Sequence, residues 1–252
     1  MRQFDFKALM PHLIAIAVFL LISAIYCKPA LEPNSILNQG DVNSWRGMSH
    51  QSFEYKEKFG HYPLWITNMF SGMPAFQVAA DTKWTPLTVV NDAFQLWLPQ
   101  PMNFFFLACI CFYFLCVCLR IRTFPAILGA LAFAYCSYSS IIISAGHNTK
   151  MMALAYSPAV IGAALLLFQK KYLSGFAWMT VFTTLQIAQM HQQISYYLFL
   201  ILGFLTISYS ILLIRQKSFT DLGKALGLMI LAGLVSVGAN AINIFPAMDY
   251  AK

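Results

Sequence analysis

Seven long runs of apolar residues dominate the chain. They cover, to within a residue or two, positions 9–27, 102–119, 124–144, 151–168, 174–190, 194–214 and 225–245. Each run is close to the roughly 20 residues that a helix needs to cross a bilayer. The runs also lack the strict alternation of a membrane barrel strand. The pattern therefore predicts an all-α polytopic membrane protein with about seven transmembrane helices and a long, partly helical first loop.

Composition agrees with this class. Of the 252 residues, 59% are hydrophobic and 10% are charged, whereas a soluble domain carries about 25% charged residues. A secreted or cytosolic soluble enzyme is therefore excluded. The net charge of +7 does not indicate nucleic-acid binding, because the basic residues are spread over short connections. The six cysteines include five within apolar runs, where packing is a better explanation than disulfide or metal chemistry.

The basic residues predict the orientation, because short cytoplasmic loops of membrane proteins are enriched in Lys and Arg. With a cytoplasmic N-terminus at 1–8, nine basic residues fall on the inner side against two acidic ones: Arg2, Lys7, Arg120, Arg122, Lys170, Lys171, Arg215, Lys217 and Lys224, against Asp5 and Asp221. The first span, 9–27, lacks a small-residue cleavage site and is expected to be retained. The loop 28–101, the connections 145–150 and 191–193, and the end 246–252 are then extracytoplasmic. Residues 1–252 form a single membrane module, with six further spans within 102–245.

The long loop is too rich in aromatic residues to be a solvated linker. One helix is predicted at 42–59, after Asp41 and ending at Gly60. A second is predicted at 86–98, with Thr85 as N-cap and Pro86 at its first position. Its apolar stripe of Leu87, Val90, Phe94 and Trp97 would lie along the membrane surface. Between them, residues 60–74 suit a compact turn region packed on the outer ends of the spans; the loop could also be a simple lid.

Asp41 is the first polar residue that needs an explanation. A carboxylate a few residues outside the first span, next to Gly40, can act as a general base or hold a divalent metal. The alternative is an N-cap for a helix beginning at Val42. Both interpretations stay open from the residues alone.

Two further polar clusters map to the same outer face. His147, Asn148 and Lys150 offer hydrogen-bond donors beside a glycine at the start of a helix, which suits a phosphate; a capped turn with a solvated lysine is the alternative. The second cluster comprises Gln186, Gln189, His191, Gln192 and Gln193. Its amides would face a polar cavity or bond between helices. Arg46 is a further candidate for substrate binding.

Four stretches carry a resemblance to a known family: QGDVNSWRGM (39–48), PLWITNMFSGMPAFQ (63–77), AGHNTKMMALAYSP (145–158) and HQQISYY (191–197). In this order they resemble the YfhO family of bacterial membrane proteins, along essentially the whole chain. Members of that family are longer, so the chain looks like an N-terminal portion. The family is similar to polytopic GT-C glycosyltransferases, which take a sugar from a polyprenyl-phosphate carrier at the outer face of the membrane.

The resemblance implies roles for several residues. In GT-C enzymes an acidic residue in the first outer loop serves as base or metal ligand, and Asp41 stands at that place. Lys150 and His147 are our choice for the carrier phosphate, on charge and location. A second acidic residue among Glu54, Glu57, Asp81 and Asp92 stays undecided, as does a divalent metal; no organic cofactor is implied.

The expected function is transfer of a sugar from a polyprenyl-phosphate donor to a glycan or lipid acceptor of the cell envelope, in the inner (plasma) membrane of a bacterium. The expected partners are the lipid bilayer, the polyprenyl-phosphate-linked sugar and the acceptor, with no nucleic acid. A transporter or lipid flippase is the rival, and it would require polar residues or discontinuous helices within the membrane. A non-catalytic membrane scaffold is the third possibility.

Overall fold

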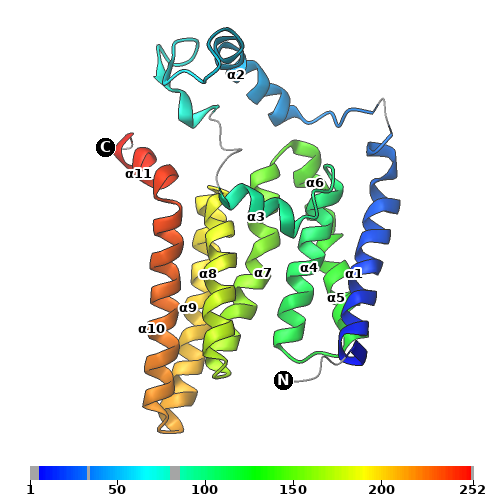
Figure 1. The fold of residues 1–252 in the computed structure, drawn as a ribbon, viewed down its shortest axis with the longest axis vertical. Coiled ribbons are helices and arrows are strands. Elements are labelled where there is room, and N and C mark those ends of the chain that lie inside the picture. Colours follow the sequence, from blue (N-terminus) through cyan, green and yellow to red (C-terminus); the bar gives the residue numbers. More distant parts are fainter. Residues whose placement is uncertain (1–5, 33–34, 80–85, 251–252) are drawn as a thin grey trace.

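The computed structural model describes residues 6–32, 35–79 and 86–250. A bundle of near-parallel and antiparallel helices makes up most of it (Figure 1). The helices of the bundle are α1 (Phe6–Cys27), α4 (Met102–Cys118), α5 (Thr123–Ala134), α6 (Ser137–Ala145), α7 (Asn148–Phe168), α8 (Tyr172–Ala188), α9 (Gln192–Arg215) and α10 (Phe219–Ala239), followed by α11 (Ala241–Tyr250).

Within the described residues, five helical segments are long and apolar enough to cross a membrane: Leu9–Ala30, Thr123–Ala145, Asn148–Phe168, Gln192–Arg215 and Phe219–Ala239. The all-helical class of the prediction is thus confirmed, with several helices of membrane-spanning character. All seven apolar runs are mainly helical, but α4 and α8 have 17 residues each. Seven spans therefore stay a prediction.

Two of the predicted spans differ from the observed helices. The run 124–144 is interrupted, because α5 ends at Ala134 and Cys136 is extended before α6. A serine-rich segment follows, and short polar side chains compete with helical hydrogen bonds; the Cys136 thiol lies 3.4 Å from the Ser139 hydroxyl. The run predicted at 225–245 begins six residues earlier and ends before Asn240. Asp221 occupies the first turn of α10, where a carboxylate is favoured by the helix dipole.

Helix α7 is the centre of the bundle, and most of its residues are buried. It packs against α4 and α8 through small residues that let helices approach closely. Gly162 faces α4 so closely that a Cβ would lie 3.1 Å from the Phe114 ring, and Gly175 of α8 approaches Leu167 of α7. The packing of the core therefore depends on glycines at the helix contacts as well as on large apolar side chains.

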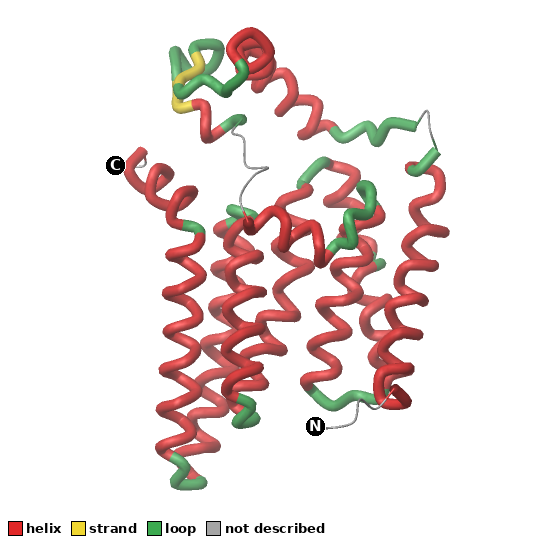
Figure 2. The backbone as a smooth tube through the Cα atoms, viewed as in Figure 1, coloured by secondary structure: helices red, strands yellow, loops and turns green. Residues whose placement is uncertain are grey.

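The long loop begins with the short helix η1 (Lys28–Ala30) and contains α2 (Gly40–Phe59), β1 (Trp65–Ile66), β2 (Met73–Pro74), η2 (Ala75–Gln77) and α3 (Pro86–Phe94). Helix α2 ends at Phe59, followed by Gly60, so the predicted end of this helix is confirmed; Gly60 is left-handed. The two strands lie at the far end of α2, away from the bundle (Figure 2). The prediction that residues 60–74 pack on the spans is wrong. They pack around Ile66, Met73 and Ala75, and the Gln51 side chain of α2 hydrogen-bonds Thr67 and Asn68.

Helix α3 crosses the end of the bundle that is opposite the N-terminus (Figure 1). It ends at Phe94 rather than at 98, because Leu96 and Trp97 adopt left-handed conformations before Pro99. Thr85, its predicted N-cap, lies outside the described residues. Only part of the predicted apolar stripe packs on the protein: Phe94 contacts the rings of Trp178 and Phe182, while Trp97 is exposed.

Candidate functional site

The turn between α6 and α7 builds the centre of the candidate site. Gly146 is left-handed (φ 100°) and its N–H donates to the carbonyl of Ile143, while the N–H of His147 donates to that of Ile142, both at 3.0 Å. This closes the end of α6, and His147 then caps the start of α7. The predicted connection 145–150 is therefore shorter than expected. Asn148 and Lys150 belong to the first turn of α7.

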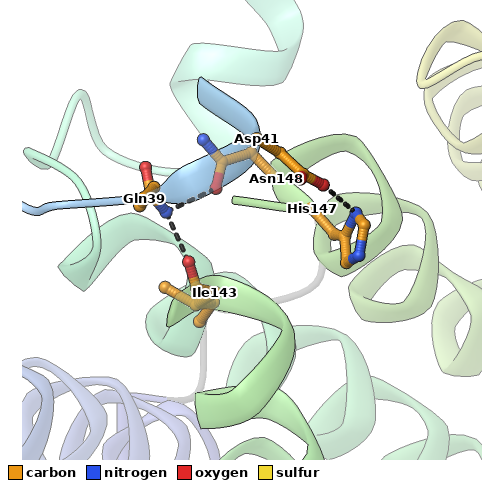
Figure 3. Close-up of polar contacts among 5 residues, drawn as sticks. All are labelled: Gln39, Asp41, Ile143, His147 and Asn148. Carbon is orange, nitrogen blue, oxygen red and sulfur yellow. Dashed lines mark hydrogen bonds and ion pairs between the residues drawn. The ribbon is translucent and has the colours of Figure 1, made fainter. Parts of the chain in front are cut away.

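The start of α2 lies on this turn. The Nδ1 atom of His147 is 3.0 Å from Oδ2 of Asp41 (Figure 3). Beside this pair, the Gln39 amide nitrogen donates to the carbonyl of Ile143 and, at 3.1 Å, to Oδ1 of Asn148 (Figure 3). Residues from the first loop and from the α6–α7 turn thus form one cluster. The N-cap of α2 is Gln39 and not Asp41, because the helix begins two residues earlier than predicted. Asp41 is free of a capping role and its carboxylate turns to His147.

Gly146 makes this approach possible. A Cβ at this position would lie 3.1 Å from Cβ of Asp41 and 3.1 Å from the backbone nitrogen of Val42. Since ordinary carbon contacts begin near 3.5 Å, any side chain would push α2 away from the turn. The glycine is required twice, for its left-handed backbone and for the contact it permits.

The pair is at the surface. The side chains of Asp41 and His147 are 58% and 49% exposed, and an exposed ion pair contributes only about 0–1 kcal/mol to stability. The main effect of the ion pair is therefore to orient the side chains. The Asp41 carboxylate holds the His147 imidazole in place, and both groups stay accessible to solvent. One turn along α7, the Lys150 ammonium lies 5.2 Å from the centre of the Tyr138 ring, a distance at which a cation is attracted to an aromatic face.

His191 belongs to the neighbouring turn between α8 and α9, where Met190 is left-handed and His191 precedes Gln192 at the start of α9. Desolvation lowers the pKa of His191 below its ordinary value of 6.5; a backbone hydrogen bond opposes this shift in part, and the electrostatic effect of Lys150 and His147 adds to it. Its Nδ1 atom is buried and has no hydrogen-bond partner in the described part of the chain.

The glutamines have different environments. Gln186 is fully buried and its amide exchanges hydrogen bonds with the Ser195 hydroxyl at 3.1 and 3.2 Å. It therefore joins α8 to α9 and does not face a polar cavity. Gln189 donates to the carbonyl of Leu185 at 2.9 Å and more weakly to Oδ1 of Asn91, at 3.4 Å. Gln192 and Gln193 are exposed in the first turn of α9.

A polar network under α3 was not foreseen from the sequence. The hydroxyl of Tyr156, which is fully buried in α7, donates to Oδ1 of Asn91 at 2.9 Å. Asn103 donates to Gln95 at 2.6 Å, and Gln95 donates to the carbonyl of Asn91. Asn91 and Gln95 are one turn apart in the sequence, and this spacing could have indicated a polar face on the helix. The network holds α3 to the bundle through its polar face.

The remaining candidates lie apart from this cluster or beside α3. Arg46 is exposed further along α2. Glu54 pairs with His50 at 3.2 Å on the same helix, and Glu57 is near its end. Asp81 lies outside the described residues. Asp92 accepts a hydrogen bond from Asn91 at 3.3 Å and is the acidic candidate nearest the bundle among those described. No group of three His, Cys, Asp or Glu side chains in the described ranges could hold a metal ion.

An apolar crevice of about 270 Å³ lies between α4, α5, α7 and α9. Leu154 in its wall is one turn from Lys150, and Ile194 is three residues from His191. The crevice therefore extends into the bundle from the level of the two histidine turns. Ser157 and Tyr197 carry hydroxyl groups, and the other residues of the wall are aliphatic, phenylalanine and proline.

No protein-family model, no curated protein and no solved structure matches this chain. The class that the fold defines is an all-helical protein with several helices of membrane-spanning length and hydropathy.

Proposed function

We propose that this chain transfers a sugar from a polyprenyl-phosphate donor to a glycan or lipid acceptor of the cell envelope, in the manner of a GT-C glycosyltransferase. The observation that carries the proposal is the 3.0 Å contact between Asp41 and His147. It brings the acidic residue of the first loop, the proposed base, next to the group proposed to bind phosphate. The resemblance to the YfhO family supplies the choice of substrate class.

The reaction is a single displacement at the anomeric carbon. The acceptor oxygen forms a bond to that carbon while the bond from carbon to the phosphate oxygen breaks, and the electron pair leaves with polyprenyl phosphate. The proton of the acceptor hydroxyl passes to the Asp41 carboxylate. Lys150 and His147 balance the negative charge on the departing phosphate. The sugar is transferred with inversion.

The prenyl chain occupies the crevice between α4, α5, α7 and α9 in this proposal. The crevice is apolar and begins one turn below Lys150, so a carrier phosphate at Lys150 would have its hydrocarbon tail in the crevice. Helices α4 and α8 complete seven spans, and the end of the bundle that carries α2 and α3 faces outward from a bacterial inner membrane. The basic residues of the opposite turns support this orientation.

The test uses the full chain in proteoliposomes, supplied with radiolabelled polyprenyl-phosphate hexoses and envelope lipid as acceptor. Asp41→Asn should lower the transfer rate at least a hundredfold, the usual size of a general-base contribution. Asn can still accept the His147 hydrogen bond, so its effect isolates the proton transfer. His147→Gln should lower the rate by about a hundredfold, the size of the loss when one group that stabilises transition-state charge is removed. The exposed His50, on the same helix as Asp41, provides the matched control for His147: His50→Gln should retain the wild-type rate. Equal rates for all three variants would overturn the proposal.

A transport or flippase role is the second candidate, because two interruptions fall within apolar helical segments. One is at Tyr135 and Cys136, between α5 and α6, and the other is at Asn240, between α10 and α11. Asn240 is fully buried and donates to the carbonyls of Thr184 and Ser236. If labelled lipid-linked sugar crosses the bilayer of the proteoliposomes without being transferred, and Asn240→Ala stops this movement while Asp41→Asn does not, transport is the function.

A further inference from the structure

A second apolar groove lies at the opposite end of the bundle from Asp41 and His147. It has a volume of about 580 Å³ and is formed by the first turns of α1 and α5. Its apolar walls are Phe6, Met10, Pro11, Ile14, Phe124 and Ile127. The volume falls within the roughly 300–1,000 Å³ of small-molecule sites. The groove plays no part in the proposed transferase reaction.

Helix packing keeps this groove open. His12 of α1 is hydrogen-bonded to the Tyr113 hydroxyl of α4 at 2.9 Å, which fixes α1 against α4. The side chains of Met10 and Ile14 are thereby left to line the groove with α5. Pro11 also lines it, and it removes one helical hydrogen bond at this level. Because the walls are hydrocarbon, water gains no hydrogen bonds there, and the occupant must itself be apolar.

Basic residues at the mouth of the groove favour an apolar ligand that also carries a negative charge. Lys7 lines the groove itself, and the exposed Arg122 directly precedes Thr123, which also lines it. Arg120 lies in the same turn. Asp221 is the acidic residue described at this end of the bundle. Its carboxylate forms an ion pair with Lys170 at 2.6 Å and accepts a hydrogen bond from the Tyr172 hydroxyl at 2.8 Å. Lys7, Arg120 and Arg122 therefore place basic side chains at the mouth of the groove.

From the apolar walls and the basic mouth we infer that this groove binds an anionic phospholipid of the surrounding leaflet. One acyl chain lies along Met10, Ile14 and Phe124, and the headgroup phosphate is at Lys7 and Arg122. This inference needs neither the proposed sugar transfer nor its substrates. It concerns the leaflet that adjoins the N-terminal end of α1.

The experiment measures binding of phosphatidylglycerol with a fluorescent acyl chain to the purified full chain in detergent. Unlabelled phosphatidylglycerol should displace the probe, and phosphatidylcholine should displace it far less. Arg122→Gln and Lys7→Gln should each weaken binding about fivefold, the equivalent of about 1 kcal/mol for each basic residue at an anionic surface. Lys217→Gln is the matched control, because it removes a charge at the same end of the bundle in the turn between α9 and α10.

A second pair of variants tests the groove itself. Met10→Trp should fill the groove and abolish saturable binding of the probe, whereas Leu231→Trp, on the exposed surface of α10, should leave it intact. The inference is overturned if phosphatidylcholine competes as well as phosphatidylglycerol. It is equally overturned if Arg122→Gln binds like Lys217→Gln, or if Met10→Trp retains the site. Asp41→Asn should bind the probe normally, which separates this test from that of the transferase proposal.

Discussion

Replacing Gly146 by alanine tests whether the first loop is held to the bundle as the structure indicates. The added Cβ would meet Cβ of Asp41 and the nitrogen of Val42 at 3.1 Å and Cβ of Gln39 at 3.3 Å. Inserting a methyl group into a close contact costs about 1–3 kcal/mol. Because the start of α2 is at the surface and can give way, we expect the lower end of this range. A further cost of about 1–2 kcal/mol comes from the left-handed backbone and applies whether or not α2 is attached.

The two costs have different observable effects. The cost of the close contact favours detachment of α2 from the turn. A cost of about 1 kcal/mol corresponds to about fivefold faster amide exchange in the first turn of α2. The backbone term lowers the thermal unfolding temperature of the whole protein. Hydrogen exchange followed by mass spectrometry resolves the first effect, and a thermal melt measures the second.

Gly47 supplies the control within the same helix. It is helical, and a Cβ added there would have no neighbouring atom within 4 Å, so alanine at this position should stabilise α2 by about 1 kcal/mol and slow its exchange. The reasoning is refuted if Gly146→Ala leaves unchanged the exchange of the Asn43 amide, which donates to the Gln39 carbonyl at 3.0 Å and is the first hydrogen-bonded amide of α2. It is also refuted if exchange in the bundle rises in parallel with exchange in α2.

Two further predictions concern the neighbouring residues. Tyr156→Phe removes a buried hydroxyl that donates to Asn91, so it should destabilise the protein by about 1 kcal/mol and accelerate exchange in α3; unchanged melting and exchange would contradict this. The lowered pKa of His191 means that the unfolded chain binds a proton more readily than the folded one below pH 6.5. Stability from this residue is therefore present above that pH and is lost as the pH falls toward its folded pKa. His191→Gln should flatten this acid side of a plot of melting temperature against pH, and an identical slope in the variant would contradict it.

Local signals in the sequence predicted the helix ends at several places. Gly60 ends α2 and Pro86 begins α3, because a left-handed glycine and an N-terminal proline act within a few residues. Other helix ends carried no such signal. Arg120, Lys170 and Lys217 follow α4, α7 and α9 in left-handed conformations that glycine would adopt more easily. The backbone conformation of these turns is set by the positions of the helices that they join. The side chains of Arg120, Lys170 and Lys217 are exposed.

Among the polar residues, too, the sequence predicted some features and not others. The sequence identified Asp41 by its place in the first loop beside Gly40, and His147 and Lys150 because they lie in a short connection between apolar runs. It could not decide whether Gln186 faces a cavity or another helix, since both fates suit an amide in an apolar segment. The buried bond to Ser195 depends on how α8 and α9 are rotated about their axes. Tyr156 and Asn91 escaped notice because each is an ordinary residue in its own helix.

By itself the sequence determined the helical class, the apolar segments and the asymmetry of basic residues, because hydropathy and charge are summed along the chain and need no knowledge of contacts. Only the tertiary structure decided that Gln39 and Ile143, 104 residues apart, are neighbours, and that Asp41 turns to His147 instead of capping its own helix. The physical reason is that such contacts depend on helix order, on small residues such as Gly146 and Gly162 that permit close approach, and on rotations about helix axes, none of which is encoded in a local pattern.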